Sequence, residues 1–275
     1  MKRDLLDLAK KSIKEFFRML GVGITSKTTL SRLESFERSR SDATLRLLSK
    51  FEPEVSITLL SNLNKATSQL QQDLFVLGVL RCKRKGFYVE FGATDGIAIS
   101  NTYLLETEFG WKGILVEPGK VWHRELLENR RGSIIETKCV WRNSSQKLEF
   151  RETNELELST INSFKSSDIH GYQRAKGKVY EVETISLLDL LQKYNAPEYI
   201  DFLSIDTEGS EFDILNAFDF DKYKFAVIAC EHNFTANRER IFELLESKGY
   251  IRVFEDLSLF DDWYIDASLT KGLKL

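Results

Sequence analysis

Small and acidic residues gather at three places in this sequence, each directly after a short apolar run. The first is the turn at residues 92–96, the second is Glu117, and the third is the segment 206–210. Glycine lets a backbone approach a ligand closely, and carboxylates bind hydroxyl groups, hold cations or accept protons. The three segments therefore predict a site for a polar ligand, built at the ends of strands.

The turn at residues 92–96 favours a nucleotide-type ligand. It lies between an apolar run, residues 87–91, and the helical spacing of residues 101–109, as in the cofactor-binding corner of α/β folds. Its glycines are spaced G-x-x-x-G rather than G-x-G-x-x-G, which argues against a dinucleotide. Glu117, about 20 residues further on, has two acceptor oxygens suited to the hydroxyls of a ribose. The plainer alternatives are an ordinary strand-to-helix turn and a surface glutamate.

A second acidic group follows two later apolar runs. Asp206 and Glu208 end the first of them, and Glu231 and His232 end the next. Neighbouring parallel strands bring their carboxyl ends to one edge of a sheet, so these side chains are predicted to converge. Converging carboxylates repel one another unless a cation is present or a raised pKa keeps one protonated. Histidine is in addition a ready general base.

These acids support two predictions about chemistry. The predicted catalytic residues are His232, Asp206 and Glu208. The predicted ligands of a divalent cation such as Mg2+ are Asp206, Glu231 and His232. The alternatives are a helix start at Ser210, with Asp213 three residues on, and a hydrogen-bonded structural histidine.

The order of the predicted elements indicates an α/β fold. Strands are predicted at residues 87–91, 113–116, 134–140, 200–205, 225–230 and 250–254. Helices are predicted at residues 101–109, 121–129, 186–194, 210–218 and 236–248. This alternation predicts a mainly parallel sheet with helices on both faces. Residues 141–185 are less regular: 148–151 and 179–184 alternate like exposed strands, and the segment is predicted to be an insertion or to face the substrate.

The residues before the sheet have a helical texture. An amphipathic stripe runs from Leu5 to Leu20, and helical spacing resumes over residues 59–80. We predict a helical N-terminal extension at residues 1–72 and the main domain at residues 73–275. The extension is expected either to pack on the domain or to form a homo-oligomer through its helices.

Composition limits the classes of partner. The 275 residues are 42% hydrophobic and 29% charged, with a net charge of -3, so no strong field favours nucleic acid or an anionic membrane. No apolar run approaches the roughly 20 residues that a membrane span needs, and no signal peptide is visible. Three scattered cysteines do not form a disulfide or zinc pattern. A cytoplasmic protein is expected.

Two motifs together resemble the FkbM family of S-adenosylmethionine-dependent methyltransferases. Val89-Glu-Phe-Gly-Ala-Thr-Asp-Gly96 is similar to the first motif of that family, and Glu117 matches its acid after the second strand. Residues 200–215, built around Ile205-Asp-Thr-Glu-Gly209, resemble its most distinctive segment. The first motif occurs in many methyltransferases, whereas the second is much more specific. The resemblance covers residues 73–267, and Thr94 departs from it where the family often has Asn.

The resemblance implies a Rossmann-like class I methyltransferase sheet of seven strands, in which residues 250–254 and 262–266 form a final hairpin and the last strand is antiparallel. It implies O-methylation of a hydroxyl, often on a sugar, polysaccharide or secondary metabolite. S-adenosylmethionine is expected to contact Glu90, Gly92, Ala93, Asp95, Gly96, Asn101, Glu117, Cys139, Val140 and Asp206. The acceptor is expected to contact Ser159, Thr160, Asn233, Trp263 and Tyr264. The two aromatic rings would stack on a sugar face, with core packing as the alternative.

Two other functions stay open at this point. One is an NAD-linked oxidoreductase or epimerase of similar fold, against which stand the glycine spacing and the lack of a suitably placed Tyr-x-x-x-Lys pair. The other is a non-catalytic module that binds a partner through its N-terminal helices. The intact set of acids weighs against it.

Overall fold

The computed structural model describes residues 41–153, 159–164 and 177–274. The chain divides into two compact units, residues 1–46 and 47–275, and the second unit contains all the predicted site residues. The amphipathic stripe from Leu5 to Leu20 lies outside the described residues. The predicted domain boundary between residues 72 and 73 stays a prediction.

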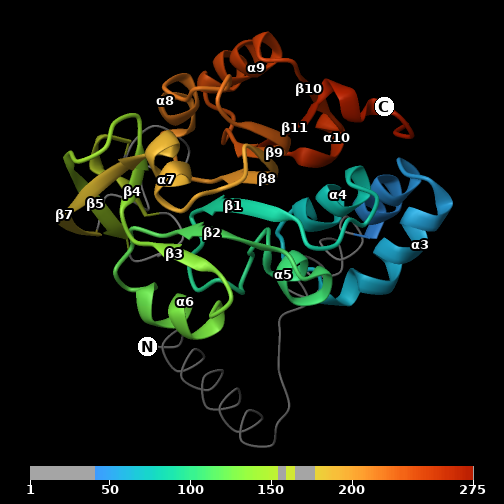
Figure 1. Ribbon diagram of the computed structural model, residues 1–275, viewed down its shortest axis with the longest axis horizontal. Coiled ribbons are helices and arrows are strands. Elements are labelled where there is room, and N and C mark those ends of the chain that lie inside the picture. The colour runs from blue at the N-terminus through green and yellow to red at the C-terminus, as the bar shows by residue number, and fades with distance from the viewer. Residues whose placement is uncertain (1–40, 154–158, 165–176, 275) are drawn as a thin grey trace, which may run out of the picture. The chain divides into compact units, whose positions relative to one another are not determined.

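Seven strands form the central sheet of the second unit (Figure 1). Their order across the sheet is β10-β11-β9-β8-β1-β2-β3. All are parallel except β11, which runs antiparallel to both β9 and β10. The Rossmann-like, mostly parallel sheet with a final antiparallel strand is therefore confirmed. The strands are β1 (Phe87–Phe91), β2 (Lys112–Val116), β3 (Ile134–Glu136), β8 (Tyr199–Ile205), β9 (Lys224–Glu231), β10 (Tyr250–Val253) and β11 (Asp261–Asp266).

Helices cover both faces of this sheet (Figure 1). Val89 and Leu203 share one core with apolar side chains of α7, α8 and α9. Successive strand residues point to opposite faces, so Tyr88 faces the other side, where Arg130 after α6 donates to its hydroxyl. The helices are α3 (Pro53–Asn62), α4 (Gln72–Val79), α5 (Tyr103–Phe109), α6 (His123–Asn129), α7 (Leu187–Lys193), α8 (Glu211–Asn216), α9 (Asn237–Ser247) and α10 (Glu255–Ser258), with short 3-10 turns η1 (Leu63–Lys65), η3 (Asn162–Phe164) and η5 (Ala267–Thr270).

A second sheet occupies the segment predicted to be an insertion. It consists of β4 (Cys139–Trp141), β5 (Lys147–Thr153), β6 (Thr160–Ile161) and β7 (Gly177–Ser186), in the order β4-β7-β5-β6. The strands expected at residues 148–151 and 179–184 are confirmed, and they pair antiparallel as β5 and β7.

The prediction of one strand at residues 134–140 is wrong. The chain turns after β3, because Glu136 Oε1 accepts hydrogen bonds from the backbone N–H groups of Thr137 (3.0 Å) and Lys138 (3.1 Å). Residues 139–141 then join the second sheet as β4, so this short segment supplies an edge strand to each of two sheets. The polar residues Glu136, Thr137 and Lys138 mark the turn between the two buried or half-buried halves.

The helical spacing at residues 59–80 is also interrupted. The buried Asp73 carboxylate accepts from the backbone N–H groups of Thr67 (3.1 Å) and Ser68 (3.4 Å), which draws this segment out of helical geometry. Gln71 has a left-handed backbone (φ 67°), and α4 begins directly after it. Among the described residues, no helix is long and apolar enough to cross a membrane.

Trp263 tests this description of the core. Its indole is fully buried and stacks on Phe75 of α4, with ring centroids 4.4 Å apart. We expect Trp263→Ala to lower the free energy of unfolding by about 3–5 kcal/mol, because a large aromatic is lost from a packed interior. Ile251→Ala, on the exposed side of β10, should cost about 1 kcal/mol or less. Urea unfolding measures both, and equal losses would contradict the assignment of Trp263 to the core.

Candidate active site

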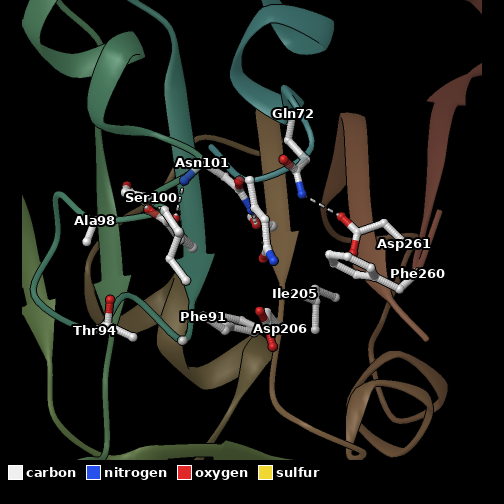
Figure 2. A pocket seen from close by; sticks show the side chains of 15 residues that line it. Gln72, Phe91, Thr94, Ala98, Ser100, Asn101, Ile205, Asp206, Phe260 and Asp261 are labelled. Atoms are coloured by element: carbon white, nitrogen blue, oxygen red, sulfur yellow. Dashed lines mark hydrogen bonds between the residues drawn. The ribbon is translucent and has the colours of Figure 1, made fainter. Parts of the chain in front are cut away.

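A polar pocket opens at the carboxyl ends of β1 and β8 (Figure 2). These neighbouring strands are where the chain order reverses across the sheet, the position at which open α/β sheets bind ligands. Four of the predicted cofactor residues line this pocket: Glu90, Gly92, Asn101 and Asp206.

Gly92 sets how closely the two strand ends approach. Its backbone is left-handed (φ 75°), and a Cβ atom placed on it would lie 2.4 Å from the backbone oxygen of Asp206. Any other residue would therefore both strain the turn and push the end of β8 away. The glycine is required by geometry at this position.

Glu90 organises the loop that forms one wall of the pocket. Its buried carboxylate accepts from the backbone N–H of Asn101 (2.7 Å), from Ser100 Oγ (3.1 Å) and from Thr102 Oγ1. Burial raises the pKa of Glu90, while the nearby Arg130 guanidinium and these hydrogen bonds lower it. Hydrogen bonds thus tie this acid to its own loop.

Arg130 supports the same loop from beneath. Its guanidinium is fully buried and donates to the backbone oxygen of Gly96 (2.9 Å), to Thr102 Oγ1 (3.0 Å) and to Glu106. Gly96 is left-handed (φ 81°), and a Cβ there would lie 2.5 Å from Arg130 Cγ. The absence of a side chain at Gly96 therefore leaves space for Arg130, whose hydrogen bonds hold the loop that forms the pocket wall.

Glu117 ties the first turn to the end of β2. One carboxylate oxygen accepts from the backbone N–H of Thr94 (2.9 Å) and the other from that of Gly119 (2.6 Å). Burial raises the pKa of Glu117 to about 7, and the charges of Asp206 and Glu152 add to the shift. The structure shows this positioning role, and the binding of a ribose by Glu117 stays a prediction.

The remaining predicted cofactor residues do not line the pocket. Ala93 is buried in the turn, and Asp95 Oδ1 accepts from the backbone N–H groups of Ile97 and Ala98, both at 2.8 Å. Cys139 and Val140 are buried in β4. Burial raises the pKa of the Cys139 thiol to about 12, and the charge of Glu117 adds to it. Contacts of these residues with a cofactor stay predictions.

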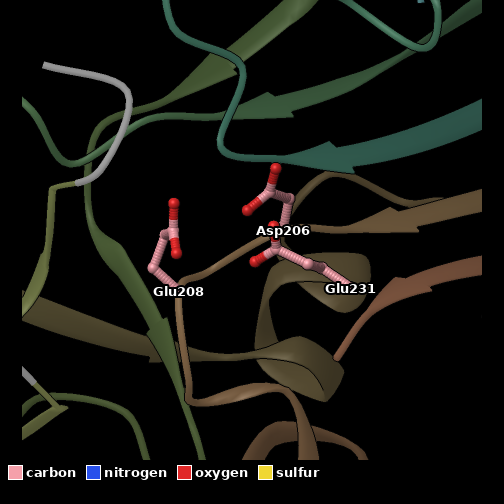
Figure 3. Close-up of side chains that lie close together, drawn as sticks. All are labelled: Asp206, Glu208 and Glu231. Carbon is pink, nitrogen blue, oxygen red and sulfur yellow. The ribbon is translucent and has the colours of Figure 1, made fainter. Parts of the chain in front are cut away.

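Three carboxylates converge beside the pocket (Figure 3). One oxygen each of Asp206, Glu208 and Glu231 lies within 4.8 Å of the other two. Asp206 is the most exposed of them, whereas Glu208 and Glu231 are buried. Burial raises the pKa of Glu231 well above its ordinary value, and the charges of Asp206 and Glu208 raise it further. The predicted convergence of the acids after β8 and β9 is present in the structure.

Hydrogen bonds hold the turn that carries two of these acids. Glu211 Oε1 accepts from the backbone N–H groups of Thr207 and Gly209, both at 3.0 Å. Thr160 of the second sheet donates to the backbone oxygen of Glu208 (3.0 Å), and Asn233 Nδ2 donates to Glu208 Oε2 (3.2 Å). Ser210 occupies the position before α8, but its side chain makes no capping bond there.

The predicted acceptor residues separate into two groups. Thr160 and Asn233 contact Glu208, and Ser159 is the residue before Thr160, with its Oγ accepting from the backbone N–H of Thr153 (3.1 Å). Trp263 and Tyr264 are fully buried. The stacking of these two rings on a sugar is therefore a wrong prediction, because Trp263 stacks on Phe75 of α4 and Tyr264 belongs to the main apolar core.

His232 does not join the acids. Its Nδ1 accepts from the backbone N–H of Phe234 (2.9 Å), so Nε2 carries the ring proton. Nε2 lies 3.7 Å from Asp262 Oδ1, and burial lowers the pKa of the ring. With one nitrogen accepting and the other protonated, the neutral ring has no lone pair to offer as a base or a metal ligand. The predicted role of His232 in both is corrected, and Glu208 takes its place in the acid group.

Gln72 and Asp261 are among the pocket residues that were not predicted to bind the cofactor. Gln72 Nε2 donates to Asp261 Oδ2 (2.8 Å), and both side chains are buried (Figure 2). Asp261 pairs with Glu231 across β11 and β9. Burial raises the pKa of Asp261 to about 7, against the hydrogen bond from Gln72. The position of Asp261 at the start of the last strand is a signal that sequence analysis can find, whereas nothing local marks Gln72.

Gly92 and Gly110 form a matched pair that tests the first turn. Both have a left-handed backbone, but a Cβ on Gly110 would meet nothing within 4 Å. Gly110→Ala should therefore cost only the backbone strain, about 1 kcal/mol. Gly92→Ala should cost at least about 2 kcal/mol more, because the Asp206 backbone must shift as well. Thermal or urea unfolding measures the difference, and equal costs would contradict the close approach of the two strand ends.

Comparison with known proteins identifies the family. The family described as Methyltransferase FkbM domain matches residues 90–252. No curated protein sequence matches the chain. Among solved structures, similar ones are an O-methyltransferase from Bacillus cereus in complex with SAH (13% identity, covering 92% of this chain and 95% of that chain, TM-score 0.39) and a precorrin-6y C5,15-methyltransferase from Geobacter metallireducens GS-15 (12% identity, 70% and 84%, TM-score 0.39). These identities are too low to assign a substrate. Since the family match spans more than half of the chain, the protein belongs to the FkbM family of S-adenosylmethionine-dependent methyltransferases.

Proposed function

We propose that this methyltransferase moves the methyl group of S-adenosylmethionine to a hydroxyl of a sugar, polysaccharide or secondary-metabolite acceptor. One observation carries the proposal: Asp206 lines the polar pocket and is also a member of the acid group. A ligand in the pocket and a hydroxyl beside the acids would therefore meet at this residue. An NAD-linked reaction has no comparable support, because the turn lacks the glycine spacing of a dinucleotide site.

The residues that line the pocket suit the binding of S-adenosylmethionine. Gly92 lets the ligand approach the backbone, and Asn101 and Asp206 offer polar atoms at the ends of β1 and β8. S-adenosylmethionine supplies an activated methyl group on a sulfonium. The protein then has to provide placement rather than covalent catalysis.

The acids fit the proton that the reaction releases. When the new C–O bond forms, the S–CH3 bond breaks, the sulfur keeps the electron pair, and the hydroxyl proton has to leave. We assign Asp206 and Glu208 as the carboxylates that accept this proton, either directly from the hydroxyl or by way of a neighbouring residue. Burial and the charges of Asp206 and Glu208 raise the pKa of Glu231 well above its ordinary value, which favours a proton on this carboxyl. A shared proton of this kind relieves repulsion within the group.

We further propose that the acid group binds a divalent cation. Asp206, Glu208 and Glu231 form an all-oxygen set, which suits Mg2+ or another hard cation. Such an ion would lower the pKa of a bound hydroxyl. It would also replace the proton on Glu231, because metal binding favours the ionised carboxylate.

The acceptor side is proposed to lie around Thr160, Asn233 and Ser159. Thr160 and Asn233 contact the acid-bearing turn, and Ser159 and Thr160 belong to the segment of the second sheet that reaches it. A cytoplasmic location and a homo-oligomer formed through the N-terminal helices stay predictions.

Isotope-labelled S-adenosylmethionine tests the reaction. Calorimetry should show that the wild-type protein binds this donor and not NAD+, and label should pass to hydroxyls in a panel of mono- and oligosaccharides. Asp206→Asn should lower methyl transfer by about 100-fold, the usual size of a lost general base. Asp213→Asn, on α8, serves as the control. Binding of NAD+ without binding of the donor would overturn the proposal.

The cation is tested by binding rather than by turnover. Mn2+ titrated into chelator-treated protein and followed by electron paramagnetic resonance should report one saturable site. Glu231→Gln should weaken it at least about tenfold, whereas Glu243→Gln on the exposed face of α9 should leave it unchanged. If the wild-type protein shows no saturable Mn2+ binding, the cation proposal is wrong, and proton transfer is the only role that we assign to the acids.

A further inference from the structure

Gln72 and Asp261 close one side of the pocket from segments that the family match does not include (Figure 2). Gln72 begins α4, and Asp261 begins β11. The two side chains are 3% and 5% exposed, and 189 positions separate them in the sequence. Their hydrogen bond therefore joins the two flanks of the family domain at the site itself.

The orientation of the Gln72 amide is determined at both ends. Its Oε1 accepts from the backbone N–H of Leu70 (2.8 Å), so its Nε2 is the atom that faces Asp261 Oδ2 at 2.8 Å. A neutral donor satisfies one carboxylate oxygen but brings no positive charge to offset the negative charge of the ionised Asp261 carboxylate. A lysine or arginine at this position would neutralise that charge.

The charge of the pocket indicates a cationic ligand. Carboxylates of Glu90, Asp206 and Asp261 line it, and none of the lining residues is Lys, Arg or His. Glu90 is bound to its loop and faces Arg130, which leaves Asp206 and Asp261 as the acids that give the pocket its character. Burial and the charges of Asp206 and Asp262 raise the pKa of Asp261, so a cation beside this carboxyl would be favourable.

A neutral acceptor lies in the same pocket. Asn101 donates through Nδ2 to Ser204 Oγ (2.9 Å), and within the part of the chain that the structure describes its buried Oδ1 has no hydrogen-bond partner. A buried acceptor without a partner is costly unless a ligand supplies a donor. An ammonium group has a positive charge and three N–H donors, which matches two carboxylates and one amide oxygen.

We propose that Asp261, positioned by Gln72, binds the α-ammonium group of the methionine arm of the donor. The inference rests on the proposed function, in which S-adenosylmethionine occupies the pocket. Gln72 is a positioning residue, because it acts on the ligand only through Asp261. The demethylated product keeps the same ammonium group, so the contact anchors both forms of the cofactor.

Three ligands separate this role from a merely structural one. S-adenosylmethionine and S-adenosylhomocysteine contain the ammonium group, whereas 5′-methylthioadenosine lacks the whole amino-acid arm. We expect Asp261→Asn to weaken binding of the first two by about tenfold, or about 1.4 kcal/mol. Binding of 5′-methylthioadenosine should change by less than about twofold. Isothermal titration calorimetry measures all three, and thermal melting confirms that the variant is folded.

Gln72→Lys gives the sharper result. The new ammonium would pair with Asp261 and preserve a hydrogen bond between α4 and β11, yet it would compete with the ligand for the carboxylate. The melting temperature should hold or rise while binding of the two ammonium-bearing ligands falls by about tenfold. Gln192→Lys, on the exposed side of α7, is the matched control and should leave binding unchanged.

The possible outcomes are distinct. Equal weakening of all three ligands would assign Gln72 and Asp261 a structural role and overturn the inference, as would unchanged binding in both variants. Failure of the wild-type protein to bind S-adenosylmethionine would instead overturn the proposed function. Selective loss of the two ammonium-bearing ligands supports the inference.

Discussion

Negative charge gathered at the ends of parallel strands is the constraint on which this structure depends. The geometry of the sheet brings Asp206, Glu208 and Glu231 together, and β11 adds Asp261 beside them. Two neutral side chains donate hydrogen bonds to these acids: Gln72 to Asp261 and Asn233 to Glu208. Glu90 differs, because the buried Arg130 lies close to it and supports the same loop. Arg130 thus offsets the charge of Glu90, which shapes the pocket wall. Asp206 and Asp261 are the acids that we propose to bind a cationic ligand or to accept the released proton.

The parts of the site that could be predicted from the sequence are those that depend on local order. A strand, a glycine turn and a helix succeed one another within residues 87–109, and the acids follow directly after β8 and β9. Parallel strands then place them at one edge whatever the remaining packing is. Gln72 could not be found in this way, since its partner Asp261 lies 189 positions away and no spacing rule connects them.

The wrong predictions share a physical cause. The type of a residue does not tell whether its side chain is buried, which atoms it contacts or where the backbone turns. Trp263 and Tyr264 have aromatic rings that could stack on a sugar, but both are buried: Trp263 stacks on Phe75, and Tyr264 belongs to the main core. His232 has the chemistry of a base, but the backbone N–H of Phe234 uses its Nδ1. The apolar residues at both ends of segment 134–140 suggest one strand, but the chain turns at Glu136, whose carboxylate accepts from the next two backbone N–H groups.

The division of labour along the chain follows from these contacts. Residues within the family match supply the turn, the acids and the wall, whereas Gln72 and Asp261 reach the pocket from outside it. The second sheet reaches the site from another direction, where Thr160 holds the backbone of Glu208. In the function that we propose, a change in the flanks would act on the donor, and a change in β6 would act on the acceptor through the acid-bearing turn. Because Asp206 is shared by the pocket and the acid group, both kinds of change converge on one carboxylate.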